Sequence, residues 1–149
     1  MTIDATFYSP ATTSGSGISA RAGIGLTSIT GTYALPATND LDTNDLIKMV
    51  HIPAGATVLE VIVDIPSGGL DTSTGVSWSV GDDGSEARYI ATNTTGRSSA
   101  GGIVRMDVGG GGGYKYTADN TIDIKIVAGA TTNTTTGTIK LTVIYTMDA

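Results

Sequence analysis

The segment "ATVLEVIVDIP", residues 56–66, decides the fold class, because its side chains point in turn to two opposite sides of an extended chain. The side that we expect to be buried carries Leu59, Val61, Val63 and Ile65. The opposite side carries Val58, Glu60, Ile62 and Asp64. An apolar period of two residues, with charges on the other side, indicates a β-strand that covers a core with one face. The segment therefore predicts a strand.

The same alternation returns in three more segments, and turn residues separate them. These segments are "GVSWSVG" (75–81), "TIDIKIV" (121–127) and "GTIKLTVIY" (137–145). Three less regular segments add further strands: "LIKMVHI" (46–52), "ARYIAT" (87–92) and "GIVRMDV" (102–108). No stretch of twelve or more residues has the 3.6-residue period of a helix. We expect an all-β protein, an antiparallel β-sandwich that is jelly-roll-like, with seven or eight short strands.

Residues 1–31 differ from the rest of the chain. They are rich in Ser, Thr, Gly and Ala, and their apolar residues occur singly. Such a segment is poorly ordered unless something holds it. We therefore predict an extended N-terminal arm over residues 1–31, flexible or ordered on a partner, and a single β-sandwich domain over residues 32–149. A length of 149 residues fits one domain.

Composition disfavours several classes of partner. The net charge is −6 at pH 7, so the field of the protein repels phosphate backbones and anionic membranes. There is no cysteine, which removes disulfides and thiolate chemistry. No apolar run approaches the ~20 residues needed to span a bilayer, and the first residues lack the basic and apolar regions of a secretory signal. We expect neither nucleic acid nor a membrane as a partner, and synthesis in the cytoplasm.

The stretch "VGDDGSEARY", residues 80–89, gathers acidic residues, a glycine and an arginine. Asp-Gly between two alternating runs favours a hairpin turn, in which we expect Gly84 to take a positive φ. An irregular calcium site of Asp82, Asp83 and Glu86 is the alternative, although the spacing does not match an EF-hand loop. We expect Arg88 to pair with Asp82 or Asp83 at the surface, where an ion pair contributes about 0–1 kcal/mol.

Other candidates for chemistry are weak. The glycine run "GGGGGYKY" (109–116) is not a phosphate loop, because Tyr114 and Tyr116 flank Lys115 where such a loop needs Gly and Ser or Thr. His51 is the single histidine, and no acidic pair stands out among the 14 Asp and Glu residues. We expect no enzyme and no catalytic, cofactor-binding or metal-binding residues. The alternation around Trp78 favours a core residue over a sugar-stacking platform.

Four segments together resemble a known family in their order along the chain. They are "IPAGATVLEVIVDI" (52–65), "VSWSVGDDGSEARYIA" (76–91), "YKYTADNTIDIKIVAGA" (114–130) and "GTIKLTVIYTM" (137–147). This order is similar to that of small capsid decoration (cement) proteins of tailed bacteriophages. The resemblance covers roughly residues 40–147, has no catalytic signature, and leaves residues 1–31 outside.

The resemblance implies a virion structural protein at the capsid surface, made in the host cytoplasm. It implies a homotrimer that binds the outer surface of the major capsid protein shell and stabilises it. A phage tail-fibre or receptor-binding module is the alternative, because such modules are also acidic, rich in Gly and Thr, and all-β. Adhesion of this kind needs apolar anchors with a polar rim.

We expect partner contacts from two groups of apolar residues. In the arm they are Phe7 and Tyr8. In the domain they are the outward residues Val58, Ile62 and Ile144, which belong either to a second buried face or to a subunit interface.

Overall fold

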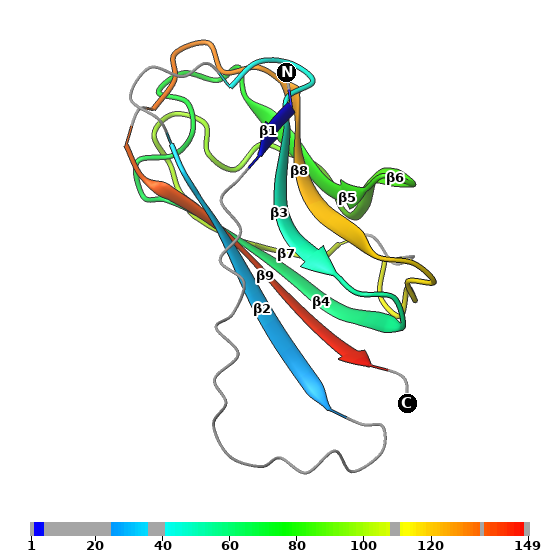
Figure 1. The fold of residues 1–149 in the computed structure, drawn as a ribbon. Coiled ribbons are helices and arrows are strands. Elements are labelled where there is room, and N and C mark those ends of the chain that lie inside the picture. The colour runs from blue at the N-terminus through cyan, green and yellow to red at the C-terminus, as the bar shows by residue number, and fades with distance from the viewer. Residues whose placement is uncertain (1, 5–24, 36–40, 108–110, 135, 148–149) are drawn as a thin grey trace.

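A computed structural model describes residues 2–4, 25–35, 41–107, 111–134 and 136–147 of the chain, which contain nine strands and no helix (Figure 1). The strands are β1 (Thr2–Asp4), β2 (Leu26–Ala34), β3 (Leu46–Ile52), β4 (Ala56–Ile65), β5 (Ser77–Asp82), β6 (Ser85–Asn93), β7 (Gly102–Arg105), β8 (Asn120–Ala128) and β9 (Thr138–Met147). Within these ranges no helix long and apolar enough to cross a bilayer was found.

Two sheets pack face to face and form a β-sandwich (Figure 1). The four-stranded sheet has the order β2-β9-β4-β7, and all its neighbours are antiparallel. The five-stranded sheet has the order β1-β3-β8-β5-β6, in which only β1 joins its neighbour in parallel among the described strands. Strands β2 to β9 divide four to each sheet, as in a jelly roll. The predicted all-β sandwich is confirmed.

The core lies between the two sheets and is built by the alternating residues that the sequence pattern selects. Trp78 is completely buried, and the inward residues of β8 and β9 are buried beside it. The inward residues of these two strands are Ile122, Ile124, Ile126, Ile139, Leu141, Val143 and Tyr145. The interpretation of Trp78 as a core residue is therefore confirmed. Its indole nitrogen donates a hydrogen bond to the Thr95 carbonyl at 2.7 Å, so burial leaves no unpaired N–H.

A β-bulge in β4 corrects the predicted faces of that strand. The register with β9 slips between Val58 and Glu60, which adds one residue to β4. Val58, expected to face outward, is fully buried, whereas Leu59, expected in the core, is 42% exposed. After the bulge the alternation follows the prediction, with Val61 and Val63 buried. A single inserted residue moves every side chain of β4 that precedes it to the opposite face of the sheet. The hydrophobic pattern of β4 does not reveal the insertion, because Val58 and Leu59 are both apolar.

Strand β5 differs from its predicted half-solvated form, because both of its faces are buried. Ser77 and Ser79, expected on the wet face, are only 6% and 2% exposed. The beginning of β6 curls over that face. The Ser79 hydroxyl donates to the Glu86 carbonyl at 2.8 Å, and a Cβ on Gly81 would lie 1.9 Å from the Ser85 carbonyl oxygen. Gly81 is therefore required for this close approach.

Strand β2 lies partly in the segment expected to be an arm. The predicted boundary between residues 31 and 32 falls inside β2, which pairs with β9 along its whole length. Gly31 allows β2 to lie against β3, since a Cβ there would be 2.0 Å from the Met49 carbonyl oxygen. The strand escaped prediction because its inward side combines Ile29 and Tyr33 with Thr27 and Gly31, a weak apolar signal.

The rest of the predicted arm is largely outside the described residues. The three residues of β1 pair with β3, and Phe7 and Tyr8 lie outside the part of the chain that the structure describes. The expectation that these two aromatic residues contact a partner stays a prediction.

Candidate functional site

The hairpin between β5 and β6 contains the acidic stretch and reverses the chain at Asp83 and Gly84. Asp82 pairs with Ser85 across this turn. The Asp82 Oδ1 atom accepts hydrogen bonds from the backbone N–H groups of Gly84 and Ser85, both at 2.9 Å. Gly84 does not have the positive φ that we expected. The carboxylate of Asp82 holds the turn instead, as a side-chain cap of the type that Asp forms in tight turns.

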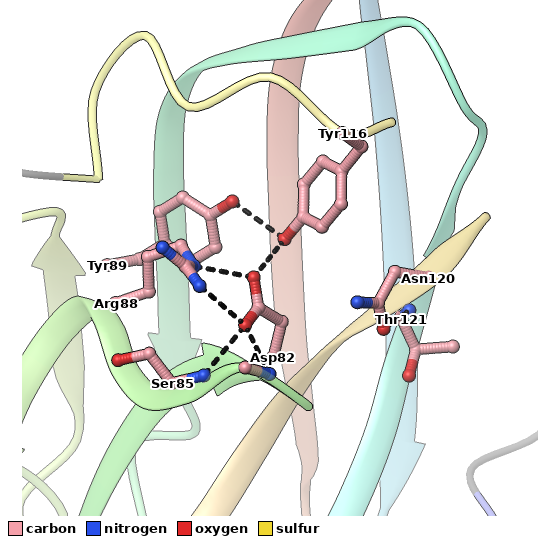
Figure 2. Close-up of polar contacts among 8 residues, drawn as sticks. Asp82, Ser85, Arg88, Tyr89, Tyr116, Asn120 and Thr121 are labelled. Atoms are coloured by element: carbon pink, nitrogen blue, oxygen red, sulfur yellow. Dashed lines mark hydrogen bonds and ion pairs between the residues drawn. The ribbon is translucent and has the colours of Figure 1, made fainter. Parts of the chain in front are cut away.

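Arg88 and Tyr116 complete the environment of Asp82 (Figure 2). Arg88 Nε donates to Asp82 Oδ2 at 2.6 Å, and Arg88 Nη2 donates to Oδ1 at 3.2 Å. The Tyr116 hydroxyl donates to Oδ2 at 2.7 Å. The Asp82 side chain is 1% exposed and that of Arg88 is 18% exposed. The ion pair expected at the surface is therefore buried, where loss of one partner is far more costly than at the surface.

Three tyrosines extend this cluster towards the glycine run. The hydroxyls of Tyr89 and Tyr116 are 2.8 Å apart and share a hydrogen bond (Figure 2). The Arg88 guanidinium carbon lies 3.7 Å from the centre of the Tyr114 ring, a cation–π contact. Tyr114 and Tyr116 pack edge to face at 5.1 Å. We call Asp82, Arg88, Tyr89, Tyr114 and Tyr116 the Asp82 cluster.

The electrostatics of the Asp82 cluster favour a fixed charge. Burial by itself raises the pKa of Asp82, but the hydrogen bonds from Arg88 and Tyr116 together outweigh it and lower that pKa. The hydrogen bond to Asp82 raises the pKa of Arg88. Burial raises the pKa of Tyr116, and its hydrogen bonds to Tyr89 and Asp82 raise it further. The arrangement keeps a charged carboxylate and neutral phenols, which suits a structural role rather than proton transfer.

The calcium alternative has little support in this geometry. Both Asp82 oxygens already accept hydrogen bonds, five in all. Glu86 turns away to Lys125, with which it forms an ion pair at 2.5 Å. No group of three or more His, Cys, Asp or Glu side chains able to hold a metal ion occurs in the described ranges.

The cluster fastens the hairpin to the other sheet. Residues 113–116 run beside the start of β4, where Gly113 N–H donates to the Val58 carbonyl at 2.8 Å and Val58 N–H donates to the Tyr114 carbonyl at 3.0 Å. Tyr116 N–H donates to the Ala56 carbonyl at 2.8 Å. Because Tyr116 also reaches Asp82, one short segment ties the four-stranded sheet to the β5–β6 hairpin. Through these contacts Tyr114 and Tyr116 anchor the segment that follows the glycine run.

A second buried carboxylate, Asp71, organises the loops around residues 66–76 and 129–134. Its two oxygens accept hydrogen bonds of 2.8–3.1 Å from the backbone N–H groups of Ser73, Gly75, Val76, Thr131 and Thr132. Burial alone raises the pKa of Asp71, but these backbone bonds lower it to about 2. Sequence reasoning missed Asp71. The run "DTST" (71–74) carried the available signal, since Asp commonly bonds a backbone N–H two residues on.

Among the buried acidic residues that the structure describes, Asp123 on β8 is the one with a carboxylate oxygen that accepts no hydrogen bond. Its pair partners are Lys48 on β3 and Gly81 on β5. The residue is 3% exposed, and no donor in the described part of the chain reaches its Oδ1 atom. Burial raises the pKa of Asp123 to about 6 against the hydrogen bond with Thr121, and the negative charge of Asp83 also raises it.

The predicted contact residues of the domain fall in different places. Val58 belongs to the core between the two sheets, as described above, so its predicted outward placement is wrong. Ile62 and Ile144 are half-buried on the outer face of the four-stranded sheet. Ile62 pairs with Thr142 and Arg105, which makes Ile144 and Ile103 its diagonal neighbours on the same face.

Ile103, which sequence reasoning missed, is 67% exposed. We call Ile62, Ile103 and Ile144 the isoleucine patch. His51, in contrast, is an exposed residue whose Nε2 lies 3.9 Å from Asp119 Oδ2.

Comparisons with known proteins place this fold among phage capsid proteins. No protein-family model matches the sequence, and neither does any curated protein. Among solved structures, a chain in the capsid of Ralstonia phage GP4 superposes with a TM-score of 0.76 at 20% identity, over 100% of this chain and 99% of that one. A chain of the Cyanophage Pam1 capsid asymmetric unit gives 0.71 at 26% identity, over 93% and 99%. This protein shares their fold.

A chain in a third phage capsid has a similar fold, with a lower TM-score. A chain in the acid-stable capsid structure of the Helicobacter pylori bacteriophage KHP30 gives a TM-score of 0.56 at 17% identity, over 83% of this chain and 90% of that one. In each of the three cases the fold covers nine-tenths or more of the other chain. The three similarities show a shared fold, and the one at 26% identity supports a phage capsid-related protein with a virion structural role.

Proposed function

We propose that this protein is a capsid decoration protein, which binds the outer surface of a bacteriophage shell built by the major capsid protein and stabilises it. The observation that carries the proposal is the fold similarity over the full length of chains in phage capsids, at 26% identity in Cyanophage Pam1. The match covers 99% of each of those chains. The sequence order of strands and turns independently resembles decoration proteins.

The outer face of the four-stranded sheet supports adhesion. The isoleucine patch presents three aliphatic side chains on one face, and Ile103 is the most exposed of them. Arg105 and Lys140 on neighbouring strands are exposed, so charged groups border the apolar centre. Protein interfaces commonly combine an apolar centre with a polar rim. We propose this face as a contact surface, either with the shell or with another copy.

Repetition strengthens such a contact. A small interface gives modest affinity by itself, but subunits that are linked to one another bind a repeating lattice with a much higher effective concentration. A homotrimer, which the resemblance implies, supplies this linkage. Binding that favours the assembled shell over its free subunits stabilises the shell by mass action.

Purified shells that lack the protein provide the test. The wild-type protein should co-sediment with them and raise their melting temperature, and cryo-electron microscopy of the source particle should place it on the outer shell. Ile103→Asp should weaken binding at least tenfold, whereas Val127→Asp, an exposed residue of the other sheet, serves as the matched control. Density on the tail instead of the shell would assign the receptor-binding alternative, and density forming the continuous shell would assign a major capsid protein.

Two parts of the proposal have their own experiments. Light scattering at micromolar concentration should give three times the chain mass of 15.0 kDa, and a monomer would remove the trimer. The arm is tested by deleting residues 1–24, because a longer deletion to residue 31 would remove most of β2. Unchanged co-sedimentation of a folded deletion variant would exclude the arm, with Phe7 and Tyr8, from attachment.

A further inference from the structure

The two sheets have four edge strands, and three of these edges are protected. Strand β1 has three residues and β7 has four, which leaves little backbone to pair. Strand β6 carries Glu86 and Arg88, and Asp107 covers it. Asp107 N–H donates to the Tyr89 carbonyl at 3.1 Å, and its Oδ1 accepts from Ala91 N–H at 2.9 Å. Short length, charge and covering loops are the usual ways in which proteins prevent further strands from adding to a sheet.

The fourth edge, on β2, has none of these protections within the part of the chain that the structure describes. The strand is nine residues long, "LTSITGTYA" (26–34), and contains neither a charged residue nor a proline. Strand β9 lies on one side of it, and no other described strand lies on the other. In an antiparallel pair, successive residues direct their N–H and C=O groups alternately to the partner and away from it. About half of the polar backbone groups of β2 therefore point to the open edge.

The side chains of β2 are also incompletely covered. Leu26 is 69% exposed. Ile29 packs against the core but remains half-buried, unlike the inward residues of the central strands. Among the described residues, Ile29 is thus an apolar side chain at this edge that an adjacent strand would cover.

Contacts with β9 and β3 already fix the extended conformation of β2 that a further strand would pair with. Each of its nine residues is in register with a residue of β9, and the Thr30 hydroxyl bonds that of Thr142 at 2.8 Å. Gly31 rests on the backbone of β3, as described above. A strand that is held by β9 along one edge and by β3 against one face requires little further ordering when another strand binds, which favours association.

We propose that the open edge of β2 accepts an extended, uncharged segment of the shell subunit as a fifth strand of the four-stranded sheet. Backbone hydrogen bonds would supply affinity, and an apolar side chain beside Ile29 would supply register, as in other cases of strand addition. This inference rests on the proposed function, because it names one element through which the protein contacts the shell.

The size of the edge favours the shell over a second copy in solution. Nine residues span about 30 Å, and a sheet edge is about 10 Å thick. Such a contact buries roughly 300 Å² on each partner, or about 600 Å² in total. This total is well below the ~1,200 Å² of the smallest stable interfaces. Edge pairing alone therefore gives a weak dimer. On a shell, the other contacts of the bound protein raise the effective concentration of the segment, so the same pairing is sufficient.

Hydrogen exchange of the full chain, free and bound to shells, tests the proposal. The peptide that covers 26–34 should exchange at least tenfold more slowly on shells than in free protein, while the peptide covering β7, the other edge of the same sheet, serves as the control. Binding with unchanged exchange in β2 would overturn the inference and leave the proposed function intact. Failure to bind shells would instead remove the proposed function. Slowing that depends on protein concentration without shells would assign a second copy and also overturn the inference.

A pair of proline variants supplies an independent test. Backbone N–H groups alternate along β2, so one of Thr27→Pro and Ser28→Pro removes a bond to β9 and the other removes only an N–H of the open edge. The variant that removes only an N–H of the open edge should keep its melting temperature within a few degrees, and its affinity for shells should fall at least tenfold. Wild-type binding by this folded variant would contradict strand addition.

Discussion

Tyr116 donates its hydroxyl proton to Asp82 Oδ2 at 2.7 Å, and this bond connects a segment paired with β4 to the turn of the β5–β6 hairpin. The same hydroxyl contacts that of Tyr89 at 2.8 Å. A single phenol therefore joins the two sheets through a buried charge. Since a particle surface protein has to keep its shape while it is bound, the rigidity of this joint is relevant to the proposed role.

The first prediction concerns that hydroxyl. Tyr116→Phe should lower the free energy of unfolding by about 1.5–3 kcal/mol, because it removes a hydrogen bond to a charged, buried carboxylate. Tyr89→Phe, which loses only the bond between two phenols, should cost about 0.5–1.5 kcal/mol. Urea unfolding of the two variants beside wild type measures both values. Equal losses would show that the charge of Asp82 does not strengthen the Tyr116 bond.

The second prediction separates the two adjacent aspartates of the hairpin. Asp82→Asn should destabilise the protein by about 3–5 kcal/mol, because Arg88 then keeps a buried charge without its partner. Asp83→Asn, at an exposed position, should stay within about 0.5 kcal/mol of wild type. Adding calcium should leave the melting temperature of wild type unchanged. An increase that the double variant Asp82→Ala/Asp83→Ala does not show would restore the calcium site.

The third prediction is a dependence on pH that comes from Asp123. Its pKa in the folded protein is about 6, above the usual 3.8. The folded state therefore holds this proton more tightly than the unfolded chain does. The free energy of unfolding should rise as the pH falls from about 6 to about 4, by on the order of 2–3 kcal/mol.

Asp123→Asn should remove this rise and should be more stable than wild type above pH 7. Asp42→Asn, at an exposed position, is the matched control. Chemical unfolding at each pH gives the comparison. A wild-type curve that stays parallel to that of Asp123→Asn between pH 7 and pH 4 would show that Asp123 titrates normally.

The fourth prediction concerns the opposite shift at Asp71. Backbone hydrogen bonds lower its pKa to about 2 against the effect of burial, so its contribution to stability is present above pH 4 and is lost as the pH falls towards 2. Asp71→Asn should cost about 2–4 kcal/mol at pH 7, because an amide offers one acceptor oxygen to the N–H groups that a carboxylate bonds with two. Hydrogen exchange of residues 129–134 should accelerate in this variant. Unchanged exchange there would mean that Asp71 does not organise the loops.

The fifth prediction tests the contact of β2 with β3. Gly31→Ala places a Cβ where the Met49 carbonyl oxygen lies, at 2.0 Å, so one strand has to move. We expect a loss of about 1–3 kcal/mol or more. Gly25→Ala, just before the same strand, meets no atom within 4 Å and should change stability little. Similar melting temperatures for the two variants would contradict the close approach.

Most strands were predictable because the pattern that indicates a strand lies within a few consecutive residues. A period of two residues needs nothing beyond the neighbours along the chain, and it located β4, β5, β8 and β9 within a few residues of their observed bounds. The exceptions have identifiable causes. At the bulge in β4, Val58 and Leu59 are both apolar, so the pattern does not mark the insertion, and β2 has Gly31 at an inward position because the backbone of β3 occupies that space.

The Asp82 cluster was predictable only in part. Adjacent residues predict the turn at Asp83 and Gly84. Arg88 is near enough to Asp82 in the sequence to suggest an ion pair between them. Tyr116 lies 34 residues away from Asp82, and no local pattern connects them. The burial of the pair, which decides its energy, depends on the segment after the glycine run packing over the hairpin.

The sequence by itself determined that this is an all-β chain with a sandwich core, because alternation and turn residues are properties of short segments. The tertiary structure alone decided which carboxylates are buried, where β4 inverts its faces, and that no described strand lies beyond β2 at the edge of its sheet. These features arise where segments distant in sequence meet, so their physical cause is the packing of one sheet on the other. The opening segment illustrates both: residues 56–66 predicted a strand, and pairing with β9 decided that Val58 faces the core and Leu59 the solvent.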